Sequence, residues 1–185
     1  MLFLSLFLAC LGNKSIDPAD VGENDSSVIV EERICATLKG RQICDFPAIN
    51  EVGEEVALSD LYGEPIVLDL SAMWCGPCVI AGNAMQQKAD ILPGVTFLTV
   101  LIENTSGEPP QAYDVDSWKT SRGIISEPVW GSSRDILSSD PLDMENHLFL
   151  SGWPTFYFID SEGNLQEYMR GYDEATIMEK AAALD

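Results

Sequence analysis

The sequence predicts one α/β domain in which a central mixed β-sheet is flanked by helices and preceded by a β-hairpin extension. Two observations predict it. An apolar strand, a helix and a second apolar strand follow one another between residues 66 and 102, an order typical of parallel strands. A hairpin and a final helix then occupy residues 155–183. With 185 residues, of which 46 % are hydrophobic, the chain can form one such core and still carry extensions.

The centre of the sheet comes from two apolar runs. Ile66–Ser71 (IVLDLS) and Val95–Ile102 (VTFLTVLI) are too continuously apolar for half-exposed strands, so both are expected to be buried on two faces. The helix between them runs to about Asp90. Shorter elements follow: a helix at 116–122, a strand at 128–130, hairpin strands at 155–160 and 165–170, and a last helix at 173–183 with Asp173 as its N-cap.

Charge is strongly unbalanced along the chain. Its 30 acidic residues outnumber its 10 basic ones, which gives a formal net charge of -20. Such a surface repels phosphate backbones and anionic head groups, so no nucleic acid is expected as a partner. The simplest interpretation is a solubilising acidic surface, and a preference for basic partners is the alternative.

Three parts are expected along the chain: a signal or lipoprotein anchor segment at 1–12, a flexible acidic linker at 13–32 and the folded domain at 33–185. The opening residues, MLFLSLFLACL, are apolar but far short of the roughly 20 that a membrane-spanning helix needs. Ala9-Cys10 resembles the processing site of bacterial lipoproteins, so Cys10 is a candidate lipidation site. No Lys or Arg precedes this run, and a plain secretory signal is the alternative.

The cysteines favour an exported protein. Five are present, and if Cys10 carries lipid the other four form two local pairs, as expected in an oxidising compartment. A turn at Lys39-Gly40 would place Cys35 opposite Cys44 in a hairpin, with Cα atoms about 4.5 Å apart. We therefore expect a structural Cys35–Cys44 disulfide; unpaired thiols or metal ligands are the alternatives.

The strongest motif is Trp74-Cys75-Gly76-Pro77-Cys78, placed where the first buried strand passes into a helix. A helix N-terminus offers unpaired N–H groups and the positive end of the dipole, both of which stabilise a thiolate at Cys75. Cys78 lies one turn further on the same face, so it can attack a mixed disulfide formed by Cys75. Zinc sites use the same spacing, but the position predicts a redox-active disulfide that needs no cofactor or metal.

These residues resemble a known superfamily. The segment IVLDLSAMWCGPC resembles the active-site strand and loop of thioredoxins, and residues 46–183 resemble the membrane-associated TlpA/ResA-type branch. Leu58–Gly63 (LSDLYG), Trp118 and Pro128-Val129 are typical of that branch. The resemblance implies a thioredoxin fold and a thiol–disulfide oxidoreductase acting on disulfide-containing or dithiol proteins outside the cytoplasm.

The resemblance assigns three further site residues. Asp69, six residues before Cys75, matches the buried carboxylate that helps to move the proton of the second cysteine; a solvent-facing strand residue is the alternative. Pro154, after Trp153, matches a cis-proline whose loop presents backbone to a substrate; a trans turn proline is the alternative. Trp74 is expected to cover the active-site surface or else to be merely structural.

The chain departs from this branch in two places. Many ResA-like proteins carry a Glu shortly after the second cysteine, whereas Val79–Gly82 has none, so Asp69 would serve alone. Residues 103–113 have no clear counterpart; they are either a partner-selecting segment or a tolerated insertion. The dipeptide Gly76-Pro77 is that of reducing thioredoxins. It favours a reductant, which we expect to be kept reduced by a membrane electron donor. The N-terminal segment and the cysteine pattern described above add the expectation of a periplasmic location and a lipid anchor.

Two other functions fit parts of the pattern. A peroxiredoxin-like peroxidase shares the fold but expects Thr or Ser three residues before its reactive cysteine, whereas Ser71 is four before Cys75. A metal-carrying or structural lipoprotein of this fold would want Cys-x-x-x-Cys and a suitably placed histidine. The single histidine, His147, lies in a polar stretch and is expected to be solvated.

Overall fold

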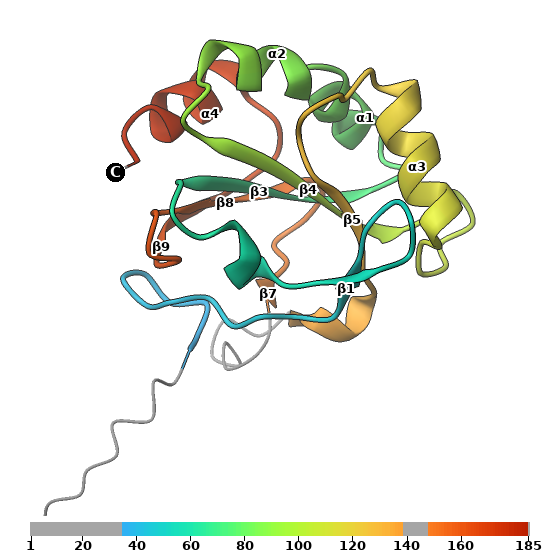
Figure 1. The fold of residues 1–185 in the computed structure, drawn as a ribbon, viewed down its shortest axis with the longest axis horizontal. Helices are drawn as coiled ribbons and strands as arrows, with labels where there is room; N and C mark the ends of the chain where they lie inside the picture. The colour runs from blue at the N-terminus through green and yellow to red at the C-terminus, as the bar shows by residue number, and fades with distance from the viewer. Residues whose placement is uncertain (1–34, 139–147, 185) are drawn as a thin grey trace, which may run out of the picture. The chain divides into compact units, whose positions relative to one another are not determined.

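A mixed sheet of seven strands forms the centre of the computed structural model, which describes residues 35–138 and 148–184 (Figure 1). The strand order is β2-β1-β5-β4-β3-β8-β9. The strands are β1 Ala48–Ile49, β2 Glu55–Val56, β3 Ile66–Ala72, β4 Thr96–Glu103, β5 Val129–Gly131, β8 Thr155–Ile159 and β9 Leu165–Arg170. Strands β3, β4 and β5 are parallel, and β8 pairs antiparallel with β3, so the predicted mixed sheet is confirmed.

The four α-helices of the described residues cover one face of this sheet (Figure 1). They are α1 Gly76–Asn83, α2 Met85–Ile91, α3 Ala112–Ser121 and α4 Glu174–Ala181. The other face packs against the chain before β3, the 3₁₀ helices η1 Leu58–Leu61 and η2 Arg134–Ile136, and β7 Leu148–Phe149, which pairs with β6 Leu137–Ser138. The sheet therefore has a core on each side, and the α-helical core contains both cysteines of the central motif.

Strand β3 is buried along its whole length because it lies between β4 and β8. Its alternate side chains point to opposite faces: Val67 joins the α-helical core, whereas Leu68 and Leu70 join the other core. Asp69 has the same parity as Val67, so it points toward the helices. The continuous apolar pattern of this strand and of β4 was thus a correct signal for strands in the middle of a sheet.

The helix after the cysteines is divided where the sequence predicted one helix to about Asp90. Helix α1 ends at Asn83, and α2 begins at Met85. The N–H of Ala84 between them bonds back to Ala81 and Gly82 in a tighter turn. Weak helix formers at the end of α1, a glycine and an asparagine, favour a break there. Helix α3 also starts earlier than the predicted 116–122, because the Asp114 carboxylate accepts a hydrogen bond from the Gln111 N–H and caps it.

Residues 35–44 form a turn but not the predicted two-stranded ladder. The Arg41 N–H donates to the Leu38 carbonyl at 2.9 Å, closing a turn around Lys39-Gly40. A second hydrogen bond crosses the turn, from Ala36 N–H to Gln42 O at 2.9 Å. Residues 40 and 41 bond instead to the start of β9: Gly40 N–H donates to Leu165 O at 2.7 Å, and Leu165 N–H donates to Arg41 O at 2.9 Å. The hairpin that precedes the parallel strands is instead β1–β2, which extends the sheet beyond β5.

The expectations for the N-terminal segment 1–12 with Cys10, for the linker 13–32 and for His147 fall outside the described residues. Within 35–138 and 148–184, no helix combines the length and apolar character that crossing a bilayer requires.

Candidate active site

The cysteine pair lies at the carboxyl end of β3, where the chain turns into α1. Cys75 is the N-cap of α1, and its sulfur accepts a hydrogen bond from the Cys78 N–H at 3.2 Å. Pro77 lies in the first turn, where its missing N–H costs nothing. The two sulfurs form a disulfide, with the Cα atoms 5.2 Å apart. Cys75 is 5 % exposed and Cys78 is fully buried, so an attacking group reaches the pair through Cys75.

Asp69 lies inside the domain, on the sheet face that carries the helices. It is 1 % exposed, which excludes a solvent-facing strand residue. One carboxylate oxygen, Oδ1, accepts a hydrogen bond from Ser71 Oγ at 2.8 Å, and Oδ2 has no partner among the described residues. Burial raises the pKa of Asp69 to about 7, while the Ser71 hydrogen bond and the charge of Lys88 act in the opposite direction. This acid can therefore change protonation state near neutral pH.

The loop before β8 lies beside the end of β3, because Leu70 of β3 pairs with Thr155 of β8. The Trp153–Pro154 peptide bond is cis. The Pro154 carbonyl accepts a hydrogen bond from Gly171 N–H at 2.8 Å, and Thr155 Oγ1 donates to the Gly152 carbonyl at 2.6 Å. The first bond joins the loop to the residue that follows β9, and the second lies within the loop.

Trp74 and Trp153 form an aromatic wall near the cysteines. Trp74 is 49 % exposed, and its ring meets that of Trp153 edge to face, with centroids 6.1 Å apart. The Trp74 Nε1–H donates to the Glu103 carboxylate at 2.6 Å. Trp74 therefore combines an exposed apolar face with a fixed orientation.

Glu103 is a site-neighbouring acid that the sequence analysis missed. It ends β4, is 5 % exposed, and pairs with Arg134 of η2 as well as with Trp74. Burial acts to raise the pKa of Glu103, but the hydrogen bonds from Arg134 and Trp74 hold it below its ordinary value. The signal for this acid was available, since the carboxyl ends of parallel strands meet at one edge of a sheet. In the sequence, Glu103 is the first residue of the segment 103–113, which has no clear counterpart in the family and therefore drew attention away from this acid.

Lys88 of α2 is a second residue that the sequence analysis missed. It is 2 % exposed and lies on the buried side of α2 with Met85, whose sulfur accepts a hydrogen bond from Thr99, the β4 partner of Asp69. A lysine in a helix is ordinarily assigned to the solvent side, so composition gives no warning of its burial. Residues 35–138 and 148–184 contain no group of three or more His, Cys, Asp or Glu side chains arranged for a metal ion.

The second disulfide joins Cys35 to Cys44, with Cα atoms 4.9 Å apart. It closes the turn that pairs with the start of β9.

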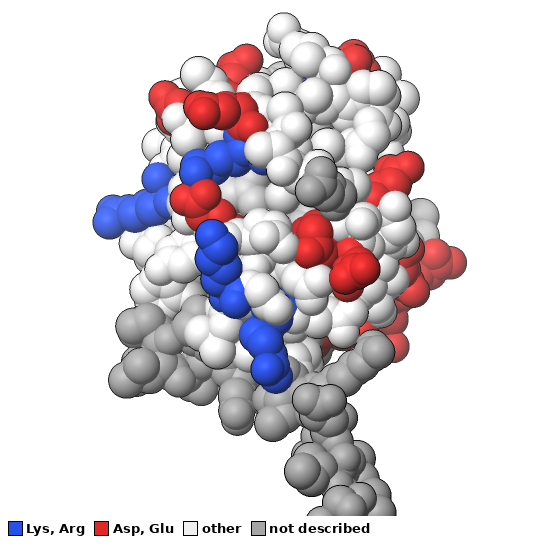
Figure 2. All heavy atoms as spheres, turned by 90° about the vertical axis from the view of Figure 1, so that its left-hand side faces the viewer, with Lys and Arg blue, Asp and Glu red and all other residues white. Residues whose placement is uncertain are grey.

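Figure 2 looks onto the left-hand side of Figure 1, and its Lys and Arg side chains lie among acidic ones. Elsewhere in the described residues, Lys180 pairs with Glu167 at 2.6 Å. The basic residues on this face are thus interleaved with acids and form no uniform basic surface.

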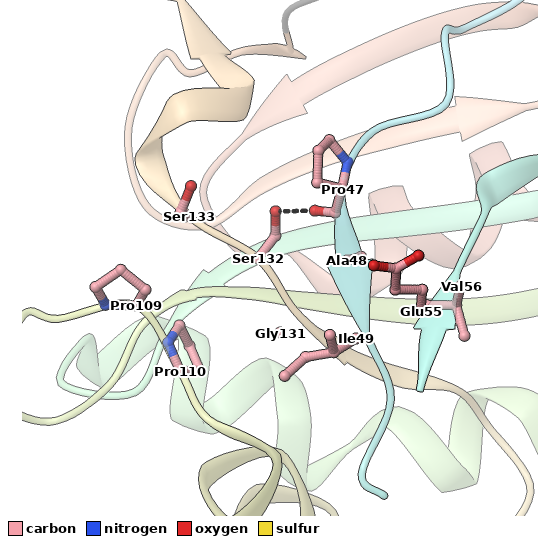
Figure 3. Close-up of a pocket in the computed structure, with 10 residues that line it drawn as sticks. All are labelled: Pro47, Ala48, Ile49, Glu55, Val56, Pro109, Pro110, Gly131, Ser132 and Ser133. Carbon is pink, nitrogen blue, oxygen red and sulfur yellow. Dashed lines mark hydrogen bonds between the residues drawn. The ribbon is translucent and has the colours of Figure 1, made fainter. Parts of the chain in front are cut away.

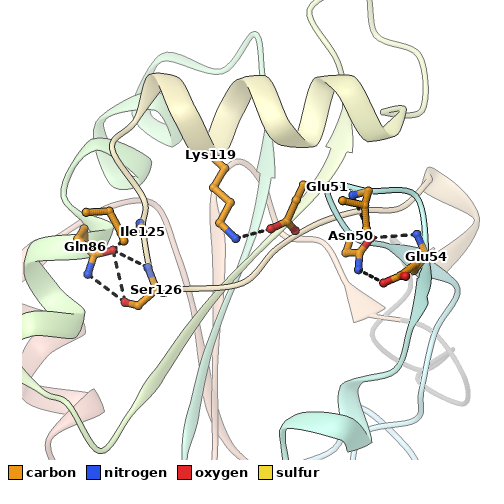
Figure 4. A network of polar contacts seen from close by, with 8 residues as sticks. Asn50, Glu51, Glu54, Gln86, Lys119, Ile125 and Ser126 are labelled. Carbon is orange, nitrogen blue, oxygen red and sulfur yellow. Dashed lines mark hydrogen bonds and ion pairs between the residues drawn. The ribbon is translucent and has the colours of Figure 1, made fainter.

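Two further regions of the domain lie outside the cysteine site: an apolar groove and a network of polar contacts. An open apolar groove lies between β1, β5 and the Pro109-Pro110 turn, where Ser132 Oγ donates to the Pro47 carbonyl at 2.6 Å (Figure 3). On another side, Gln86 Oε1 accepts hydrogen bonds from the N–H groups of Ile125 and Ser126, and Lys119 pairs with Glu51 (Figure 4). These contacts join α2 to the segment before β5 and join α3 to the turn between β1 and β2.

Residues 39–168 match the model of the AhpC/TSA family. A thioredoxin H-type from Oryza sativa subsp. indica is 28 % identical over 81 residues, which cover 42 % of this chain and 66 % of the rice protein's own length. A thiol:disulfide interchange protein of the thioredoxin family from Chlorobium tepidum TLS has a TM-score of 0.58 and 21 % identity, covering 76 % of this chain and 93 % of that one. A secreted Mycobacterium tuberculosis disulfide oxidoreductase has a TM-score of 0.56 and 18 % identity, covering 75 % of this chain and 96 % of that one. At these identities the two structures show a shared thioredoxin-like fold.

Proposed function

Because the chain belongs to the AhpC/TSA family, we propose that it is a thiol–disulfide oxidoreductase that reduces disulfides of exported proteins through Cys75 and Cys78. The observation that carries the proposal is the placement of this pair. Cys75 caps the N-terminus of α1, and Cys78 lies buried one turn further in. Free N–H groups and the helix dipole at this position stabilise a sulfur anion.

The exchange takes place in two steps. In the reduced protein, the Cys75 thiolate attacks one sulfur of a client disulfide; a bond forms to Cys75, and the second client sulfur leaves with the electron pair. Cys78 then gives up its proton and attacks the Cys75 sulfur. The Cys75–Cys78 disulfide forms, the first client sulfur leaves as a thiolate, and the client has gained the two electrons that the pair has lost.

Asp69 is the proposed acceptor of the Cys78 proton. Its side chain points to the face of the sheet on which Cys78 is buried. A group with a pKa of about 7 can both take and release a proton near neutral pH.

The client is proposed to dock between Trp74 and the loop that holds Pro154. The half-exposed Trp74 ring offers an apolar face, and the loop offers backbone beside the end of β3 for strand-like pairing. Glu103 keeps this wall in place through its hydrogen bond from Trp74.

The cellular setting is part of the proposal. Residues 13–32 would link the domain to a lipid on Cys10, and a membrane electron donor would return the oxidised pair to its dithiol form. The two local cysteine pairs support an oxidising compartment. The similar M. tuberculosis protein is described as secreted. The Gly76-Pro77 dipeptide supports reduction as the direction of electron flow.

A peroxidase is the rival activity within this fold. It would need a hydroxyl poised at the reactive cysteine, but the Ser71 hydroxyl is committed to Asp69 at 2.8 Å. Peroxide consumption by a Cys78→Ser variant at a rate matching disulfide reduction by the wild type would favour this rival.

The proposal is tested by reduction of insulin disulfides with dithiothreitol as the electron source. The wild-type chain should accelerate precipitation of the insulin B chain, and Cys75→Ser should abolish the acceleration. The Cys35→Ser/Cys44→Ser double variant is the matched control and should remain active. A redox titration that places the Cys75–Cys78 couple near about -120 mV would overturn the reducing direction.

A further inference from the structure

Arg170, the last residue of β9, is a surface cation without an acidic partner. Its side chain is exposed, and no hydrogen bond or ion pair joins it to another described residue. The acid-rich chain supplies a carboxylate to three other basic side chains, those of Lys119, Arg134 and Lys180. With 30 acidic residues against 10 basic ones, an arginine without such a partner is available to a carboxylate of another molecule.

The register of the sheet places Arg170 at the edge that carries the cysteines. Thr155, the first residue of β8, pairs with Arg170 on one side and with Leu70 near the end of β3 on the other. Strand β3 leads directly into the turn that holds Cys75. The end of β9 and the reactive cysteine therefore lie at the same edge of the sheet.

The side chain of Arg170 rests against the loop that holds Pro154. A Cβ on Gly152 would lie 2.4 Å from Arg170 Nε and 2.9 Å from its Cζ, so the guanidinium fills the space that a side chain at position 152 would take. Gly152 has a φ of 146°, a conformation that favours glycine. The Gly171 N–H, one residue after Arg170, donates to the Pro154 carbonyl at 2.8 Å. The cation thus lies directly on the loop backbone.

Consecutive residues of this loop bring an aromatic contact and the cation together. Trp153 meets the ring of Trp74 with centroids 6.1 Å apart, and Gly152 contacts Arg170. Trp74 directly precedes Cys75 in the chain. A client strand that pairs with the loop while its own cysteine reaches Cys75 therefore passes the guanidinium of Arg170.

The chemistry of the guanidinium determines which client group it binds. It is planar and always charged, and its five N–H donors form a fork that matches the two oxygens of a carboxylate. Its three atoms nearest to the Cβ position of Gly152 are Nε, Cζ and Cδ, and the terminal nitrogens are not among them. Arg134, the arginine beside the end of β4, already pairs with Glu103. Arg170 is thus the arginine at this edge that has its charge free for a client.

We propose that Arg170 is a specificity-determining residue that binds an acidic side chain of the client close to its reactive cysteine. This inference rests on the proposed function of the Cys75–Cys78 pair. Because an extended chain advances about 3.3 Å per residue, the acid is expected within about three residues of the client cysteine. The net charge of -20 acts on the total charge of a client, whereas Arg170 acts on the position of one acid within it.

Peptides of equal net charge test the proposal. Each has one cysteine, capped as a mixed disulfide with 2-thiopyridine, and one glutamate moved from three residues before the cysteine to three after it or to the far end. Reduced wild-type protein should release 2-thiopyridone about three- to fivefold faster from one near-cysteine peptide than from the far-end peptide. Arg170→Gln should remove this preference, and Arg170→Glu should transfer it to a peptide with lysine at the same position.

Lys39→Gln is the matched control. It also removes one positive charge, but in the turn that bonds to the start of β9, at the opposite end of that strand. This variant should keep the preference of the wild type. Equal wild-type rates for all glutamate positions, or the full preference in a folded Arg170→Gln protein, would overturn the inference.

A second measurement needs no arginine variant. Cys78→Ser is linked through Cys75 to the preferred peptide or to the same peptide with glutamine in place of glutamate, and both adducts are treated with phenylglyoxal. Peptide mapping should show Arg170 modified about threefold more slowly in the glutamate adduct. Equal modification in the two adducts would contradict the proposal.

These outcomes separate the inference from the function on which it rests. If the reduced wild-type chain releases 2-thiopyridone from none of the peptides, Cys75 exchanges no disulfides, and the proposed function fails together with the inference. If release proceeds at rates that do not depend on the position of the glutamate, only the role of Arg170 fails.

Discussion

Asp69 is the residue at which stability and function oppose each other. Its carboxyl is buried with a single hydrogen bond, so the folded domain resists ionising it. The same resistance places its pKa near 7, where a proton acceptor for Cys78 is useful. Removing the acid should therefore make the fold more stable and the exchange slower.

Asp69→Asn should stabilise the folded protein above pH 7. The pKa of Asp69 is about 7 in the folded protein against an ordinary 3.8, so the folded state binds the extra proton between these values. The unfolding free energy of the wild type consequently falls as pH rises from about 4 to 7. The variant has no carboxyl at this position, so its unfolding free energy does not fall in this way. At pH 8 it should be more stable than the wild type by on the order of 2–4 kcal/mol. Urea unfolding of the oxidised proteins at pH 4, 6 and 8 measures the difference, and a difference that does not vary with pH would contradict the account.

Single residues also show how far the sequence could predict the site. Asp69 was identified because it lies at a fixed spacing from Cys75 within a recognisable strand. Glu103 and Lys88 have no comparable spacing from a recognisable motif. Their importance depends on which strand ends meet and on which side of α2 is buried, and tertiary packing decides both.

At the scale of elements, the contact between α1 and α3 depends on a glycine. A Cβ at Gly82 would lie 2.9 Å from Trp118 Cζ2, and the Trp118 ring is 1 % exposed with Arg122 stacked at 4.6 Å. Gly82→Ala should therefore destabilise the domain by about 1–3 kcal/mol, although alanine favours a helix by about 1 kcal/mol. Urea unfolding measures this change. Gly94→Ala, which adds a Cβ in open space, is the control and should be close to neutral.

The Cys35–Cys44 disulfide fastens the first described turn to the edge of the sheet. The bridge spans a sequence separation of 9. Constraint of the unfolded chain by a loop of this size is worth about 2–3 kcal/mol. Cys35→Ser/Cys44→Ser should lower the unfolding free energy by that amount in urea and keep insulin reduction. Two free thiols in the non-reduced wild-type protein, found by mass spectrometry, would contradict this role.

Elements differ in how far the sequence predicts them. The strands β3 and β4 are long apolar runs, and burial on both faces makes such runs distinctive. The strands β1 and β2 contain two residues each, and they exist because they continue an edge already formed by β5. The 35–44 segment was predicted to pair with itself, and hydrogen bonds from Ala36 to Gln42 and from Arg41 to Leu38 do cross its turn, but Gly40 and Arg41 also bond to the start of β9.

At the scale of the whole molecule, the net charge of -20 should influence which clients arrive. A strongly acidic surface accelerates encounter with cationic partners and slows it with anionic ones. A cationic disulfide peptide should be reduced about tenfold faster than an anionic peptide of matched sequence at low salt, and the gap should narrow at 0.5 M salt. Stopped-flow rates with the two peptides measure it, and equal rates at low salt would count against electrostatic selection.

The most direct test of the central claim is to identify which sulfur bonds to the client. Cys78→Ser, mixed with a small peptide disulfide and quenched with acid, should give a one-to-one adduct that peptide mapping by mass spectrometry assigns to Cys75. The wild-type chain should pass through this adduct and end with the Cys75–Cys78 disulfide and a reduced peptide. An adduct on another cysteine, or none at all in a folded Cys78→Ser protein, would contradict the account.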